Sequence, residues 1–254
     1  MNRLTEPSAP TPALADELFA VVDVLDAQTP LRNALSDPTA SAEVRRQLAA
    51  DVFGPRVSAG AAAMVEEAAG LRWASGPALA DALERQAIRV VFDVAQRADR
   101  LDEVEDELFR FGRIVASDGA LRTALEDRRI ALAHREQLVR DLLGDSADPL
   151  TLRLAVRAVG ARDRAYTATI DEMLALAAEV QGRAIAHVTV AAPLADEQEA
   201  RLRKALAAQA GRPVTLEVVV DPAVLGGVRV RLGDEVIDGT VSGRLDAAKR
   251  QLNR

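Results

Sequence analysis

A chain of 254 residues is long enough for one large domain or for two to three small ones. Its net charge of −7 and its aromatic share of 3% argue against nucleic-acid binding, because no basic surplus meets phosphates and few rings stack on bases. The absence of cysteine excludes disulfides and thiolate metal sites. No apolar run approaches the roughly 20 residues that cross a bilayer. We therefore expect a soluble, cytosolic protein that works at a membrane only as a peripheral partner. Residues 1–13 are polar and proline-rich and lack an apolar signal core, which predicts a disordered lead-in and not a targeting peptide.

An internal duplication occupies most of the chain. The segment "ADELFAVVDVLDAQTPLRNALSDPTASAEVRRQLAADVFG" from Ala15 aligns without a gap with "EDELFRFGRIVASDGALRTALEDRRIALAHREQLVRDLLG" from Glu105. Roughly 20 identities over about 75 positions, at a constant offset, exceed what chance produces. A unit of roughly 90 residues is too long for a solenoid repeat, so each copy should bury its own core.

Apolar residues at helical spacing predict that both copies are helical. In the first copy the predicted helices cover residues 14–27, 31–35, 42–53 and 61–69. A long helix then begins at Pro77, a residue that suits a first helical turn, and meets no stop signal before Asp99. We therefore predict one helix over residues 77–98 that closes the first copy and opens the second, so that an incomplete bundle over residues 14–76 is rigidly joined to a bundle over residues 77–180.

The second copy shows the same pattern. An apolar stripe at three- and four-residue steps is formed by Leu101, Val104, Leu108, Phe111 and Val115. Further helices are predicted over residues 120–125, 132–143, 150–159 and about 163–180, with Gly144 and Gly160 at two of their ends.

Past Gln181 the apolar period changes from helical to alternating. Alternation predicts strands over "RAIAHVTVAA" and "PVTLEVVV". Between them, residues 196–209 are predicted to form a helix whose Leu202 and Leu206 face inward. A hairpin about a Gly-Asp turn is predicted for "GVRVRL" and "EVID". A closing helix is predicted over residues 241–252. Residues 181–254 should thus form a β-α-β-β-α domain, and the whole chain should be mainly α with a small α+β C-terminal domain.

No catalytic constellation emerges from the residues. The glycines between Asp221 and Leu252 lack both the G-x-x-x-x-G-K-[ST] and the G-x-G-x-x-G order, so tight turns explain them better than a phosphate loop. The two histidines, His134 and His187, lie in different domains and are predicted to be an ordinary helix residue and an ordinary strand residue. Composition, periodicity and spacing alone indicate an acidic interaction protein with no cofactor and no metal.

The stretch "LGGVRVRLGDEVIDGTVSGRLDAAKRQL" strongly resembles the C-terminal signature of the delta subunit of F-type ATP synthases, the family of the mitochondrial oligomycin-sensitivity-conferral protein. The signature residues are Gly226, Gly227, Gly233, Asp234, Ile237, Asp238, Gly239, Arg244 and Leu245. In that family the glycines shape a hairpin and its exit into the last helix, and hold no phosphate. The resemblance extends from about Pro77 to the C-terminus; Ala195 departs from it, because the family tends to place a hydroxyl cap there.

This resemblance implies a stator subunit with no catalytic residues and no cofactor of its own. The helical domain is expected to grip N-terminal segments of the alpha subunits, and the α/β domain to grip the C-terminal helices of the b subunits. The alpha segment is expected between the helices over residues 77–98 and 150–159, against Ile88, Val91, Phe92, Ala95, Leu152 and Val156; filling of the bundle core is the competing interpretation of the first four. The resemblance further implies a place at the cytoplasmic face of a bacterial cell membrane, reached only through the complex.

The first copy departs from the family, whose members usually have one bundle. It lacks an opening helix of its own, because residues 1–12 are proline-rich. Either the start is truncated or mis-set, or this bundle borrows a helix from a partner. We expect the second copy alone to bind the alpha segment, and the first to brace the stalk or the flank of the head. Two other hypotheses remain: a helical adaptor unrelated to ATP synthase, and an enzyme whose site is split across domains.

Overall fold

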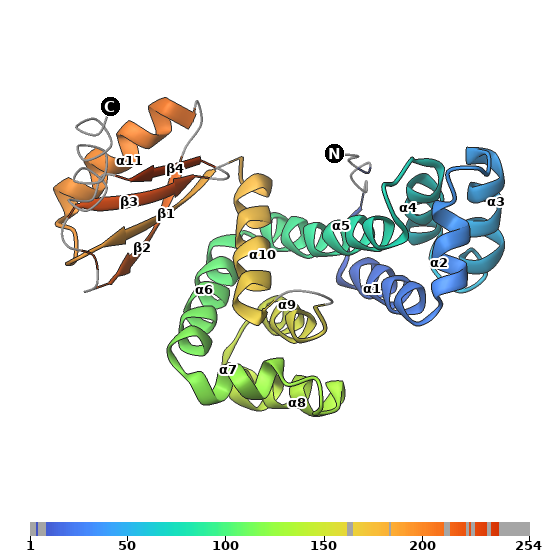
Figure 1. The fold of residues 1–254 in the computed structure, drawn as a ribbon, viewed down its shortest axis with the longest axis horizontal. Helices are drawn as coiled ribbons and strands as arrows, with labels where there is room; N and C mark the ends of the chain where they lie inside the picture. Colours follow the sequence, from blue (N-terminus) through green and yellow to red (C-terminus); the bar gives the residue numbers. More distant parts are fainter. Residues whose placement is uncertain are drawn as a thin grey trace, which may run out of the picture. The chain divides into compact units, whose positions relative to one another are not determined.

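The computed structural model describes residue 4 and residues 9–161, 165–182, 184–210, 214–221, 224, 227–232 and 235–238. Within these residues the chain is mainly helical, with a small sheet near the C-terminus (Figure 1), which confirms the predicted fold class. The chain divides into two compact units, Met1–Met173 and Leu174–Arg254. Among the described helices, none has both the length and the apolar character that spanning a bilayer requires.

Helices fill the described part of the chain up to Val180. Their bounds are α1 Pro12–Ala27, α2 Thr29–Ser36, α3 Ala42–Phe53, α4 Ala59–Gly70, α5 Gly76–Arg97, α6 Leu101–Ser117, α7 Gly119–Glu126, α8 Leu132–Leu143, α9 Pro149–Val159 and α10 Tyr166–Val180. The bounds of α3 and α8 are those predicted, and α5 is the predicted long helix displaced by one residue. Of the predicted lead-in, residues 1–3 and 5–8 lie outside the described residues, Leu4 is buried, and α1 already begins at Pro12.

Hydroxyl and carboxylate side chains fix where several helices begin. The Ser41 hydroxyl accepts the N–H of Val44, and the Asp148 carboxylate accepts the N–H of Leu150. The same kind of cap is made by Thr11, Ser58, Ser75 and Asp118. Each cap satisfies an N–H group that the start of a helix leaves without an intrahelical partner.

The duplication extends from the sequence to individual hydrogen bonds. The bounds of α7 and α8 are those of α2 and α3 displaced by 90 positions. In the first copy, the Glu17 carboxylate accepts from the N–H and the hydroxyl of Ser58. In the second, the Glu107 carboxylate accepts from the N–H of Asp148 and the hydroxyl of Thr151. In both copies a glutamate from the first helix therefore holds the start of the fourth.

An arginine at equivalent positions ties the third helix of each copy to the backbone around it. Arg45 is 4% exposed, and its guanidinium donates to the carbonyls of Asp37, Ala40, Ala69, Gly70 and Leu71. Arg135 is half-buried and donates to the carbonyls of Leu125, Ile130 and Val159. The first copy therefore closes around its arginine more completely than the second copy does.

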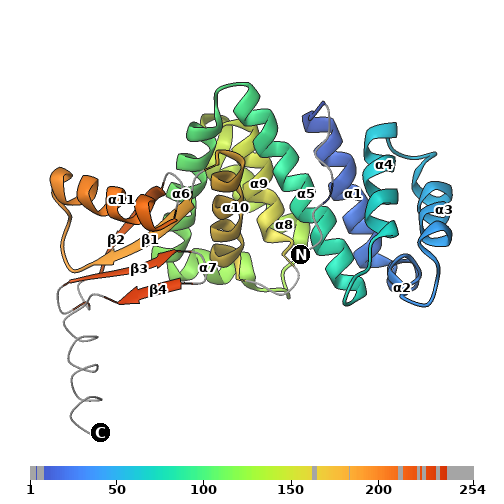
Figure 2. The ribbon, with the colours of Figure 1, turned by 90° about the horizontal axis from the view of Figure 1, so that it is seen from above.

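Helix α5 belongs to both copies. It contacts α1, α2 and α4 of the first copy and α6 and α9 of the second. Figures 1 and 2 both show α1 lying alongside α5. Its buried residues run along its whole length, from Gly76 to Ala95. A helix that is apolar on several faces needs neighbours on several sides, and the two copies supply them.

The C-terminal unit holds a four-stranded sheet in the order β2-β1-β3-β4. The bounds are β1 Ala184–Val190, β2 Val214–Val220, β3 Val228–Leu232 and β4 Glu235–Asp238, and α11 covers Asp196–Ala210. β1 pairs with β2 in parallel and with β3 in antiparallel orientation, and β3 and β4 are antiparallel. Helix α11 therefore forms the crossover that joins the parallel pair.

One face of this sheet packs against α11. The core consists of Ala186, Val188, Val190, Leu206, Val214 and Val230, with Leu202 packed against it. This confirms the inward orientation predicted for Leu202 and Leu206. Pairing of Leu232 with Glu235 confirms the predicted hairpin, whereas its Gly233–Asp234 turn and the helix predicted over residues 241–252 lie outside the described residues.

Candidate functional site

The apolar stripe of α5 that was expected to meet a partner is covered within the chain. Val91, Phe92 and Ala95 have no exposed surface, and Ile88 is 9% exposed. A side chain without exposed surface contacts an added helix only if its present neighbours move. In this structure the four residues fill the helical core.

The two apolar residues expected on α9 are accessible but lie in a different row from the one that reaches α5. Leu152 and Val156 are half-buried and stand four residues apart on one side of α9. Arg153 and Arg157, the arginine row, stand one residue further on, which is about 100° around the helix. Arg157 reaches Glu84 of α5. This ion pair with α5 is thus made by the arginine row and not by Leu152 or Val156.

Arg157 joins three helices. Its Nε donates to Oε1 of Glu84 in α5 at 2.8 Å, and its Nη1 donates to Oδ1 of Asp23 in α1 at 2.6 Å. Its guanidinium also lies over the ring of Phe19 in α1, 4.8 Å from the ring centre, where a cation is attracted by the ring face. Burial acts to lower the pKa of Arg157, but Glu84 and Asp23 outweigh it, so the pKa is raised.

Arg153 makes a second link between α9 and α1. Its Nε and Nη2 donate to the two carboxylate oxygens of Asp16 in α1 at 2.6 and 3.0 Å, a bidentate pair. Asp16 and Asp23 are 53% and 64% exposed, whereas Arg157 is 16% exposed. Helix α1 of the first copy therefore lies where α5, which both copies share, meets α9 of the second copy.

Neither row of α9 has a counterpart in the first copy. At the equivalent positions of α4 the residues are Ala62, Ala63, Glu66 and Glu67. The two copies share the glutamate that holds the start of the fourth helix, Glu17 or Glu107, and the arginine of the third helix, Arg45 or Arg135. They do not share the residues of these two rows on the fourth helix. The copies thus have a common framework and present different surfaces.

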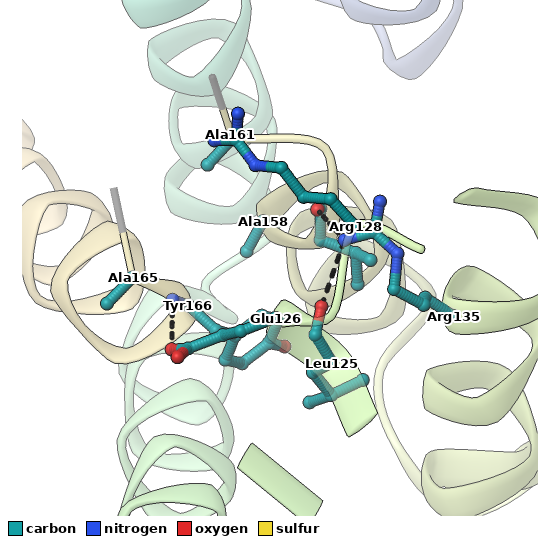
Figure 3. A pocket seen from close by; sticks show the side chains of 9 residues that line it. Leu125, Glu126, Arg128, Arg135, Ala158, Ala161, Ala165 and Tyr166 are labelled. Atoms are coloured by element: carbon teal, nitrogen blue, oxygen red, sulfur yellow. Dashed lines mark hydrogen bonds between the residues drawn. The ribbon is translucent and has the colours of Figure 1, made fainter. Parts of the chain in front are cut away.

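A cavity of about 250 Å³ opens between α7, α9 and α10 in the second copy (Figure 3). It is lined by Leu125, Glu126, Arg128, Arg135, Ala158, Val159, Ala161, Ala165 and Tyr166. The Glu126 carboxylate accepts the N–H of Tyr166, and the Tyr166 hydroxyl donates to the carbonyl of Ala155, both at 2.9 Å. Burial raises the pKa of Tyr166, which keeps its hydroxyl protonated and able to donate. These polar groups hold the ends of the helices together.

The sheet face turned away from α11 carries a row of polar side chains. Glu217, His187 and Arg231 are neighbours across β2, β1 and β3, and Nδ1 of His187 lies 2.8 Å from Oε2 of Glu217. His187 thus has a specific carboxylate partner, which its place in a strand did not predict. His134 is exposed on α8. Within the described ranges, no group of three or more His, Asp and Glu side chains could hold a metal ion.

Three of the signature residues fall within the described part of the C-terminal unit. Gly227, just before β3, has a φ of 90°, which glycine adopts readily and other residues rarely do. Ile237 and Asp238 belong to β4 and pair with Val230 and Arg229 of β3. The other signature residues, Gly226, Gly233, Asp234, Gly239, Arg244 and Leu245, lie outside the described residues.

Comparison with known proteins gives consistent matches. A family model described as "ATP synthase delta (OSCP) subunit" matches residues 89–252. This range begins within α5 and takes in the rest of the second copy and nearly all of the C-terminal unit. It leaves out α1 to α4.

Similar proteins named ATP synthase subunit delta match almost the whole chain. Those of Streptomyces avermitilis and Streptomyces griseus are 46% and 45% identical over 240 residues, covering 94% of this chain and 88% and 89% of their own. That of Cutibacterium acnes is 44% identical over 238 residues, covering 94% and 90%. These alignments include most of the first copy. A chain in the mitochondrial ATP synthase hexamer of Toxoplasma gondii shares 21% sequence identity at a TM-score of 0.42, and the match covers 68% of this chain and 98% of that one.

Proposed function

Because this chain belongs to the ATP synthase delta (OSCP) subunit family, we propose that it is a non-catalytic stator subunit in the peripheral stalk of a proton-translocating F-type ATP synthase. The family match carries the proposal, since it spans both the second helical copy and the C-terminal unit. In this role the chain keeps the catalytic head from turning with the rotor, so that rotor torque drives ATP synthesis. The chain performs no chemistry and needs no cofactor.

The two units have different partners in this proposal. The helical unit binds N-terminal segments of the alpha subunits, and the C-terminal unit binds the C-terminal helices of the b subunits. Amphipathic helices that lay an apolar face on the chain are the physical mode we expect. Several modest contacts that act together suit a joint under load, because losing one leaves the others in place. The chain then stands at the cytoplasmic face of the bacterial cell membrane as part of the complex.

Within the second copy, we propose that the apolar row of α9 contacts the alpha segment. Leu152 and Val156 keep exposed surface, whereas the α5 stripe is buried, so the α9 row is available without rearrangement. The first copy carries Ala62 and Glu66 at these positions. The second copy alone therefore binds alpha in this proposal, and the first copy braces the stalk or the flank of the head.

Co-purification tests the assignment directly. A tagged full-length chain, expressed in its own host and isolated in mild detergent, is expected to bring down the alpha and b subunits together. A stator requires both, because it links the head to the stalk. Recovery of neither subunit, with other proteins bound instead, would favour a general helical adaptor.

The substitution Val156→Glu tests the proposed alpha surface, since it gives α9 the residue that α4 carries at Glu66. We expect the affinity of the full chain for a synthetic alpha N-terminal peptide to fall at least about tenfold, because a carboxylate would be desolvated without a partner. Calorimetric titration measures this. Val44→Glu, at a 61% exposed apolar residue of the first copy, is the matched control and should bind like the parent. An unchanged affinity of Val156→Glu would remove the α9 row from the interface.

A further inference from the structure

We propose that the arginine row of α9 is a docking surface for helix α1 of the same chain, and that this contact sets the orientation of the first copy against the second. The proposal concerns the chain by itself. It goes beyond the stator role and does not depend on any partner subunit.

The two surfaces match in spacing and in charge. Asp16, Phe19 and Asp23 recur at steps of three and four residues, so they share one side of α1. Arg153 and Arg157 stand four residues apart on α9 and meet the two aspartates in order, with the Phe19 ring beneath Arg157. Two acids on one helix thus face two arginines on another.

The contact joins surfaces that the duplication has made different. Where α9 carries arginine, α4 carries Ala63 and Glu67, and where α1 carries Asp23, α6 carries Arg113. A bundle with α4 in place of α9 would set Glu67 against Asp23, and one with α6 in place of α1 would set Arg113 against Arg157. Both exchanges bring like charges together, which is unfavourable. Asp16 and Phe19 have identical equivalents in α6, Asp106 and Phe109, so the preference for α1 over α6 rests on Asp23.

The position of the contact lets it restrict a motion that the shared helix α5 does not restrict by itself. A single shared helix leaves rotation of the two copies about its axis to be fixed by side-chain packing alone. The arginine row provides a second connection, between α1 and α9, at the side of α5. Arg157 and Glu84 are 16% and 19% exposed, so solvent screens their attraction less than it screens the outer aspartates. The shared helix α5 and the contact between α1 and α9 lie on different axes, so together they fix the orientation of the first copy relative to the second.

Distance measurement between the copies tests this proposal. The chain contains no cysteine, so Ala20→Cys in α1 and Ala133→Cys in α8, both exposed, place two spin labels without any background site. In the full-length chain we expect one narrow distance distribution by double electron–electron resonance. Arg157→Glu sets a third carboxylate against Asp23 and Glu84 and should broaden the distribution about twofold or shift its maximum. Adding Asp23→Arg to Arg157→Glu should narrow it again.

Arg110→Glu is the matched control, because Arg110 pairs with Asp106 within α6 itself, and it should leave the distribution unchanged. Circular dichroism shows whether Arg157→Glu folds. If it does not, the double variant Asp16→Asn, Asp23→Asn replaces it, because substitutions at two side chains that are more than half exposed disturb folding less. The distance distribution of this double variant should broaden less than that of Arg157→Glu. A parental distribution in the folded Arg157→Glu variant, or in the double asparagine variant that replaces it, would overturn the proposal. These measurements use the chain alone, so their failure leaves the stator assignment untouched.

Discussion

Phe92→Ala is expected to lower the free energy of unfolding of the helical unit by about 3–5 kcal/mol. Phe92 has no exposed surface, so the truncated side chain leaves a cavity that its neighbours fill only in part. Because α5 packs against helices of both copies, the loss should reach the first copy as well. Trp73, the only tryptophan in the chain, lies between α4 and α5, and its fluorescence during urea unfolding reports this.

Ile114→Ala provides the control for Phe92→Ala, since Ile114 is 55% exposed on α6 and its truncation should change the free energy of unfolding by less than about 0.5 kcal/mol. The expected result is an earlier transition of Trp73 fluorescence in Phe92→Ala alone. A parental Trp73 midpoint, together with an early loss of helical circular dichroism, would mean that the two copies unfold independently.

Arg45→Met is expected to destabilise the helical unit by about 3 kcal/mol, and Arg135→Met by about 1 kcal/mol. Methionine keeps most of the apolar volume of arginine but leaves the backbone carbonyls around position 45 without their donor. Arg45 is buried, so water does not replace it easily; Arg135 is half-buried and donates to fewer carbonyls. Urea unfolding of the two variants measures both effects. Equal losses would show that burial of the guanidinium does not decide its contribution.

Helix positions could be predicted because local signals agree with one another along the chain. The bounds of α3 and α8 followed from apolar residues at helical spacing, with Gly144 at the end of α8. In the structure Ser41 caps the start of α3 and Gly54 follows its end. The long α5 followed from Pro77 and from the lack of any stop signal before Asp99. Capping residues, helix-ending residues and apolar periodicity depend only on neighbours in sequence, so they can be recognised without knowing the tertiary contacts.

The contact between α1 and α9 could not be predicted from the same signals. The family resemblance pointed to Leu152 and Val156, but arginine is long enough to bury its stem beside a neighbouring helix while its guanidinium pairs with acids. Arg157 does this with Glu84 and Asp23. A usable signal was present in the alignment of the two copies, where Arg153 and Arg157 replace Ala63 and Glu67. Positions at which duplicated helices differ in charge are candidates for contacts between the copies.

The sheet shows the same limit. Alternation predicted β1, β2 and the β3–β4 hairpin, yet it does not say beside which strand each one lies. The parallel pairing of β1 with β2 requires α11 to cross over, and β3 then takes the other side of β1. The row of Glu217, His187 and Arg231 exists only because of this order, so no local pattern in β1 could reveal the partner of His187.

Because the two copies share α5, neither can be deleted as a unit. Its buried side chains include Leu79, Ala80, Leu83 and Ala87 in the half that follows directly on the first copy. A gene that lost α1 to α4 would encode a helix with an exposed apolar face, which favours aggregation. Reversal of the duplication would therefore need several polar substitutions on α5 at the same time as the deletion. The shared helix makes the longer chain easy to keep and hard to shorten over evolutionary time.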